Sequence, residues 1–203
     1  MNNSLKDKFL YFCNAENEED YFSKTLIYLC ESNSEGSFGI IINRTVEIRL
    51  KDFFSSASED IEAKLNKEKI VIGGPVEPMT VYIIHTKDDR FEELISINKN
   101  LSISTDINLI KSILDDKGPE EFLVSFGYTG WSKGQLEREI LKGSWLITPA
   151  DKDIIFNTPA IEKINKTSKL AGFDITTVSS VSYTHLRAHE TRGNIVCRLL
   201  LEK

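Results

Sequence analysis

The chain has 203 residues, of which 40% are hydrophobic and 28% charged, a composition that predicts a soluble globular domain with a real core. Its 31 acidic and 25 basic residues give a net charge of −6, and the basic residues are scattered among the acidic ones, which disfavours nucleic acid as a partner. No apolar run approaches the roughly 20 residues that a membrane-spanning helix needs, and no secretory signal is visible, so we expect a cytoplasmic protein that does not bind membranes.

Strands joined by short loops are predicted for the first part of the chain. Lys8–Phe12 is expected to be the first strand. Residues 24–31 ("KTLIYLCE") and 38–44 ("FGIIINR") flank the turn-forming sequence "SNSEGS" and predict a hairpin. Two further strands are expected at residues 69–75 and 79–86, connected by a short loop of glycine, proline and glutamate. Short loops between strands indicate antiparallel pairing, which favours the α+β class over a doubly wound sheet.

Helices and strands alternate in the second part. Ile107, Ile110, Ile113 and Leu114 lie at helical spacing, and Gly118-Pro119 is expected to stop that helix. A threonine followed by proline predicts a helix start at two positions, because proline is favoured at the first helical residue. In full, we expect helices at 50–54, 106–116, 132–143, after 148–149 and over 158–172, and strands at 101–104, 121–130 and 144–149.

The sequence "WSKGQLEREILKG" carries the clearest helix-start signal. Ser132 followed three residues later by Gln135 predicts a capping box, with the serine as the N-cap. Trp131 and Leu136 have the spacing of a hydrophobic staple. Gly143 suits the left-handed residue that follows a helix.

Four separated stretches resemble the YqgE/AlgH family of small bacterial proteins: "DYFSKTLIYLCESNSEGSFGIIINR", "VIGGPVEP", "VYIIHT" and "SFGYTGWSKGQLEREILKGSWLITPADKDIIFNTP". The resemblance covers residues 8–177, although Thr45 stands where the family commonly has proline. It implies an α+β fold, with a split, mostly antiparallel sheet folded into a pseudo-barrel flanked by helices. It implies no established function, since the family carries only the label of putative transcriptional regulator.

The last residues resemble something different. "VSYTHLRAHET" and "VCRLLLEK" are similar to the conceptual translation of the two ends of a sequencing adapter, in one frame and in the right order. We therefore expect one domain over residues 1–180 and a non-native tail over residues 181–203. Without the tail's two acidic and four basic residues, 29 acidic and 21 basic residues remain, a net charge of −8.

The tail also holds the residues that look most like a metal site. His185 and His189 lie four residues apart, the spacing that places two imidazoles on one helix face for zinc, and Cys197 follows. If the tail is adapter-derived, these residues carry no evolved chemistry. Only His85 then remains among the histidines, so we expect neither a metal nor another cofactor.

Candidate binding residues gather around the family motifs. Gly73-Gly74 resembles a phosphate-cradling loop, but it lacks the lysine and hydroxyl of a P-loop and suits a tight turn equally well. Asn43-Arg44 offers a guanidinium for an anion, or a solvated arginine. The exposed backbone and helix start from Tyr128 to Gln135 suit an anion as well, or are explained by helix capping alone. The binding residues that we predict are Asn43, Arg44, Gly73, Gly74, Tyr128, Trp131 and Gln135.

Nucleophiles and bases are scarce outside the tail. His85 ends an apolar strand and suits either a general base or a buried histidine bonded to the backbone. Cys13 and Cys30 have no visible partner that would activate a thiol, and few unpatterned cysteines indicate a reducing compartment. We therefore expect a non-enzymatic regulatory or binding protein whose partner is an unknown protein or small molecule. An enzyme acting near Arg44, Gly73-Gly74 and Tyr128–Trp131, and a direct DNA-binding regulator, are the alternatives.

Overall fold

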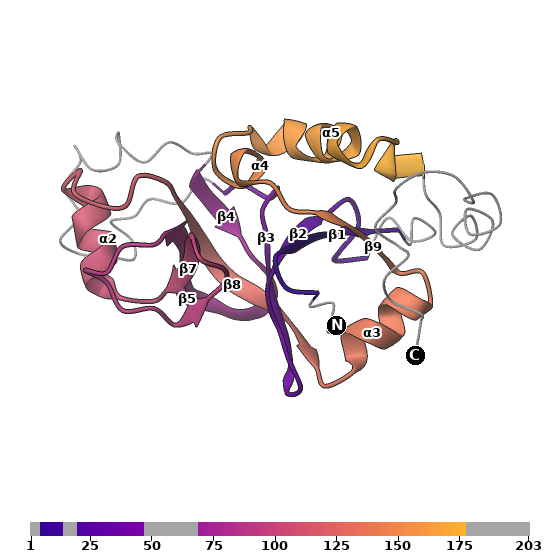
Figure 1. Cartoon of the computed structure of the whole chain (residues 1–203), viewed down its shortest axis with the longest axis horizontal. Coiled ribbons are helices and arrows are strands. Elements are labelled where there is room, and N and C mark those ends of the chain that lie inside the picture. Colours follow the sequence, from indigo (N-terminus) through magenta and orange to yellow (C-terminus); the bar gives the residue numbers. More distant parts are fainter. Residues whose placement is uncertain (1–4, 14–19, 47–68, 178–203) are drawn as a thin grey trace.

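One curled sheet dominates the computed structural model, which describes residues 5–13, 20–46 and 69–177 (Figure 1). Its strand order is β6-β7-β5-β8-β3-β2-β1-β9, and β4 pairs with β8 outside this path. The strands are β1 (Lys8–Phe12), β2 (Leu26–Ser32), β3 (Gly36–Ile41), β4 (Ile70–Ile72), β5 (Val76–Thr86), β6 (Ile95–Ser96), β7 (Leu101–Ser104), β8 (Phe122–Ser132) and β9 (Trp145–Pro149).

Helices flank this half-barrel. They are α2 (Ile107–Leu114), α3 (Gln135–Leu141), α4 (Lys152–Phe156) and α5 (Ala160–Ala171), and the 3-10 turn η3 (Ile175–Thr177) follows α5. The pairings between named strands are antiparallel except that of β4 with β8. The expected α+β class and pseudo-barrel are thus confirmed. No helix among the described residues has both the length and the apolar character needed to cross a membrane.

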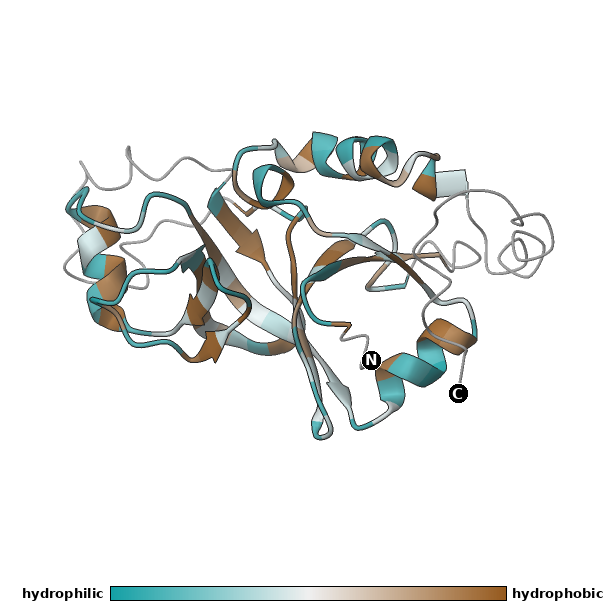
Figure 2. Ribbon diagram, in the orientation of Figure 1, coloured by the Kyte–Doolittle hydropathy of each residue, from teal (hydrophilic) through white to brown (hydrophobic). Residues whose placement is uncertain are grey.

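Both faces of the sheet are buried. Along β1, Phe9 and Tyr11 point into the largest apolar cluster, which α4 closes with Ile154, Ile155 and Phe156. Leu10, between them, joins a second cluster with residues of α3. A third cluster lies under α2. Polar and apolar residues alternate along α2 and α5 (Figure 2), as expected for helices that cover a sheet with one side only.

Several predicted elements have the expected ends. β1 has the predicted bounds, and β2 and β3 form the predicted hairpin. Asp106 caps α2 by accepting the backbone N–H of Asn108 at 2.8 Å. Gly143, with φ 77°, follows α3 as predicted, and the N–H groups of Gly143 and Ser144 donate to carbonyls of the last turn. Gly172, with φ 83°, closes α5 in the same left-handed conformation.

The predicted starts of three helices are wrong. Ser132 is not an N-cap, because β8 continues through it and Gly134, with φ 68°, precedes α3. The first Thr-Pro pair lies in β9, and α4 begins later, where Asp151 accepts the N–H of Ile154 at 3.1 Å. The second pair precedes α5, but the hydroxyl of Thr158 donates to the carbonyl of Asp153 instead of capping that helix. Residues 50–54 and the tail lie outside the described residues.

Candidate functional site

The glycine motif lies where the chain crosses its central strand. Val124 of β8 pairs with Ile70 of β4 and also with Ile83 of β5, so those two strands lie on opposite edges of β8. The connection between them, which contains Gly73 and Gly74, must therefore pass over β8. It does so with one backbone packed directly on another.

Close contact explains why glycine stands at these positions. A Cβ on Gly74 would lie 2.1 Å from the carbonyl oxygen of Tyr128, and one on Gly127 would lie 2.7 Å from the carbonyl oxygen of Gly74. Gly127 also has φ +68°, which side chains rarely adopt. The N–H of Gly73 donates to Phe126, and its carbonyl accepts from Ile41. The Gly73 backbone groups that would cradle a phosphate are therefore already hydrogen-bonded within the sheet.

Asn43 and Arg44 are held by the loop before β2. The Asn43 amide donates to the carbonyl of Lys24 at 2.9 Å and accepts the N–H of Leu26 at 2.8 Å. The Arg44 guanidinium donates to the carbonyls of Tyr21 and Ser23, and its central carbon lies 4.9 Å from the centre of the Tyr21 ring. Arg44 therefore joins the end of β3 to the loop before β2. The Asn43 side chain accepts the N–H of Leu26 in place of a backbone carbonyl.

Trp131 and Gln135 surround a carboxylate that the sequence did not single out. The indole N–H groups of Trp131 and Trp145 donate to one oxygen of Glu139, at 3.0 and 2.7 Å. The amide of Gln135 donates to the other oxygen at 2.9 Å. Ser132 donates its backbone N–H and its hydroxyl to the Gln135 carbonyl, each at 3.0 Å. We call this arrangement the Glu139 centre, and every donor in it has an acceptor.

Tyr128 lies apart from the Glu139 centre. Its ring belongs to the cluster closed by α4, whereas Trp131 belongs to the cluster under α3. Tyr128 stacks on Phe38 at 4.5 Å between ring centres and meets Tyr82 edge-on at 5.4 Å. The predicted site residues therefore fall into separate places, with Gly73, Gly74 and Tyr128 together, Trp131 and Gln135 together, and Arg44 beside Tyr21.

His85 is fully buried near the end of β5. It stands opposite Ser102 of β7 and Phe122 of β8. Its Nδ1 lies 2.8 Å from the carbonyl oxygen of Thr86, so Nδ1 carries the proton and Nε2 is left as an acceptor. Burial lowers the pKa of His85, and the Thr86 carbonyl and the carboxylates of Glu93 and Asp88 oppose that shift.

A polar row continues from His85 toward solvent. Ser102 is fully buried, and its partner in the ladder with β6 is the exposed Ser96. The Lys87 ammonium donates to the Ser96 hydroxyl at 2.8 Å and lies 3.3 Å from the Glu93 carboxylate. The pKa of Glu93 is lowered chiefly by the Ser102 hydroxyl, and Lys87 and Ser96 add to the shift against the effect of burial.

The two described cysteines are not activated thiols. Cys13 is 3% exposed, and burial raises its pKa to about 11, against a smaller opposing effect of the Leu146 backbone. Cys30 is fully buried, and burial raises its pKa well above the ordinary thiol value. Both thiols are therefore protonated at neutral pH, whereas nucleophilic attack needs the thiolate. The described residues contain no group of three or more His, Cys, Asp or Glu that could hold a metal ion.

Comparison with known proteins assigns the family. The AlgH-like family model matches residues 11–176. The chain belongs to the AlgH-like family. The UPF0301 protein YqgE of Salmonella paratyphi A is 35% identical over 171 residues, which cover 81% of this chain and 91% of that protein. A UPF0301 protein of Nitrosospira multiformis is 30% identical over 162 residues, 79% of this chain and 87% of its own length.

Solved structures agree with the fold of this AlgH-like chain. The solution structure of AlgH from Pseudomonas aeruginosa is similar with a TM-score of 0.74 and 26% identity, over 96% of this chain and 98% of that one. Protein DIP2367 of Corynebacterium diphtheriae has a TM-score of 0.62 and 16% identity, over 81% of this chain and 86% of that one. The second likeness concerns the fold alone.

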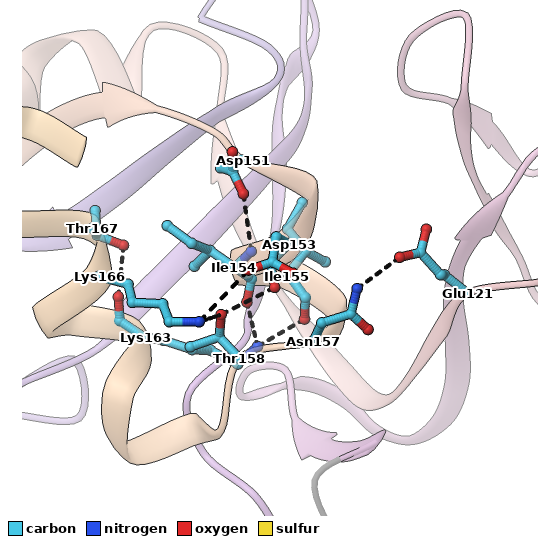
Figure 3. A network of polar contacts seen from close by, with 10 residues as sticks. All are labelled: Glu121, Asp151, Asp153, Ile154, Ile155, Asn157, Thr158, Lys163, Lys166 and Thr167. Atoms are coloured by element: carbon cyan, nitrogen blue, oxygen red, sulfur yellow. Dashed lines mark hydrogen bonds and ion pairs between the residues drawn. The ribbon is translucent and has the colours of Figure 1, made fainter. Parts of the chain in front are cut away.

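A buried lysine organises the end of this AlgH-like chain (Figure 3). Lys163 of α5 is fully buried, and its ammonium donates to the carbonyls of Ile154 and Ile155 at 2.5 and 2.7 Å. Lys69, just before β4, donates to the carbonyl of Phe156 at 2.5 Å. Positive charge at a helix C-terminus satisfies carbonyls that lack helical partners. This network holds α4 against α5 and the sheet.

Proposed function

We propose that this protein works by binding a partner and catalyses no reaction, as a cytoplasmic regulatory or binding protein. The observation that carries the proposal is the burial of Cys13, Cys30 and His85, which are the thiols and the histidine of the described ranges. Ser102, the hydroxyl next to His85, is fully buried as well. A substrate would have no approach to any of these groups without opening the core.

The surface that best suits a partner lies beside the glycine crossing. β5 inserts extra residues between Val76, which pairs with Tyr128, and Val81, which pairs with Phe126. The inserted arch carries Met79, which is 72% exposed. An exposed methionine next to half-buried aromatic rings is typical of protein interfaces. We propose that this arch and the adjacent Tyr128 contact a protein partner.

Affinity purification of the full chain from bacterial extract tests this surface. Met79→Glu places a charge on the arch, and Leu141→Glu is the matched control, because Leu141 of α3 is also 72% exposed. We expect a stoichiometric protein to be retained by the wild type and by Leu141→Glu but lost from Met79→Glu. Equal retention by all three, or no retained protein, contradicts the arch as the interface. A co-purifying small molecule that the protein converts would support the enzyme alternative.

Direct DNA binding is the less favoured function. With residues 181–203 set aside, the chain carries a net charge of −8, which repels the phosphate backbone that supplies most non-specific affinity. We expect no sequence-specific gel shift at physiological salt. A specific shift that survives competitor DNA would contradict this expectation and favour the regulator that reads DNA itself.

A further inference from the structure

Two neighbouring polar groups in the core are left over after every protein hydrogen bond is assigned. His85 Nε2 and the Ser102 hydroxyl are buried, and neither has a hydrogen-bond partner among the described residues. Their residues are direct partners in the β5–β7 ladder, so the side chains lie side by side on one face of the sheet. β5, β7 and β8 run together at the end of the sheet near α2 (Figure 1).

The hydrogen-bonding directions of these two groups are determined by their neighbours. The contact of Nδ1 with the Thr86 carbonyl makes Nε2 an acceptor, so Nε2 needs a donor. The Ser102 hydroxyl is outside hydrogen-bond geometry with Nε2 and with every other described group. A hydroxyl oxygen accepts as well as donates, so a donor that reaches both residues can bond to each.

The surroundings make these unmet acceptors costly. Ile83, two residues before His85 and therefore on the same face of β5, belongs to the apolar cluster under α2. A buried polar group without a partner destabilises the fold, because it has lost its hydrogen bonds to water and gained none in return. A molecule that donates two hydrogen bonds and has no apolar part removes both penalties. Buried waters in proteins typically fill this role, with two to four hydrogen bonds each.

We propose that one internal water molecule bridges His85 Nε2 and the Ser102 oxygen, donating a hydrogen bond to each. Ser102 is the ladder partner of Ser96, whose hydroxyl accepts from Lys87 on the solvent side. The water joins β5 to β7 at a point where their side chains do not bond directly. This site is separate from the arch that carries Met79, so each proposal stands without the other.

A crystal structure of the full-length protein, at a resolution that shows ordered water, tests the site directly. We expect one solvent peak at about 3 Å from both His85 Nε2 and the Ser102 oxygen. Long-range ¹H–¹⁵N NMR spectra of the same protein should show His85 as the neutral tautomer protonated at Nδ1. A direct bond between the two side chains with no peak, a proton on Nε2, or density for a larger molecule would each overturn the proposal.

A pair of variants gives a second test. Ser102→Val replaces the hydroxyl by methyl groups and should remove the solvent peak and shift the His85 Nε2 resonance. Ser104→Ala is the control, since Ser104 is also buried in β7 but its hydroxyl accepts the N–H of Asp106 at 3.0 Å. The control should keep both the peak and the resonance. A peak that persists in Ser102→Val would mean that Ser102 does not hold the water; if that variant does not fold, the wild-type measurements decide.

Discussion

The Glu139 centre is a partly buried polar arrangement and the His85–Ser102 pair a fully buried one, and they differ in how completely their groups are paired. Glu139 accepts from two indoles and one amide, so no donor there is left without an acceptor. His85 and Ser102 each keep an unmet atom. The complete pairing of the Glu139 centre is accounted for by a structural role. The unpaired atoms of His85 and Ser102 indicate a hydrogen-bond partner from outside the protein chain.

The largest loss of stability should come from removing the carboxylate of the Glu139 centre. Glu139→Ala leaves the N–H groups of Trp131 and Trp145 without their acceptor, and both rings are buried. We expect the free energy of unfolding to fall by about 3 kcal/mol, measured by chemical denaturation. Glu137→Ala, on the exposed side of the same helix, should change it by less than about 0.5 kcal/mol. A small loss in Glu139→Ala would mean that water replaces the carboxylate.

Removing the buried ammonium of Lys163 should also lower the free energy of unfolding, by a smaller amount. Lys163→Met keeps the length of the side chain but removes the ammonium that binds the carbonyls of Ile154 and Ile155. We expect a loss of about 2 kcal/mol, typical of hydrogen bonds to a charged group. Lys169→Met is the control, because Lys169 lies on the exposed side of the same helix. Equal losses in both variants would contradict a special role for Lys163.

The contribution of His85 to the stability of the fold should depend on pH. Burial lowers the pKa of His85 below the value of about 6.5 that it has in the unfolded chain. As the pH falls below about 6.5, the unfolded chain binds a proton first, so the free energy of unfolding decreases until the folded-state pKa is reached. Denaturation curves from pH 7.5 to 5.5 should therefore slope less in His85→Asn than in the wild type. Parallel slopes would show that the charges of Glu93, Asp88 and Lys87 compensate for burial.

The smallest effect is expected at Ser132. The sequence predicts a helix N-cap there, whose loss would cost roughly 1 kcal/mol. In the structure Ser132 ends β8, and its hydroxyl only donates to the exposed side of the Gln135 amide. We therefore expect Ser132→Ala to lower the free energy of unfolding by less than about 0.5 kcal/mol. A loss near 1 kcal/mol would indicate that the hydroxyl supports the Glu139 centre through Gln135.

Elements that depend on local patterns were predicted well from the sequence. β1, the β2–β3 hairpin, the helical spacing of α2, the glycine after α3 and the end of α5 near residue 172 all follow from alternation, helical spacing, turn residues or left-handed backbone. The start of α3 was predicted wrongly because Ser132 pairs with Gly36, a contact between distant segments that extends β8 past the local signal. β6, with two residues, is too short for any periodicity to reveal.

The candidate sites were less predictable because they are built across strands. His85 was recognised, but its partner Ser102 is set by the register of β5 against β7, which no local pattern specifies. Glu139 and Lys163 look like ordinary charged residues of exposed helix faces, and only the position of each helix on the sheet turns them inward. The glycines at residues 73 and 74 stood out in the sequence as a phosphate loop or a tight turn, whereas the close approach of their backbone to β8 depends on a distant segment that no local pattern shows.

The central position of β8 also has a consequence for folding in the cell. β3, β4 and β5 all pair with β8, yet each of them leaves the ribosome before β8 is made. At about 5–20 residues per second, β3 waits roughly 5 to 20 seconds for its partner. During this interval the strand edges that will flank β8 are open to other chains. The partners within the β1–β2–β3 meander and within the β5–β7–β6 group are all made before β8, whereas β9, the second partner of β1, is made only after it.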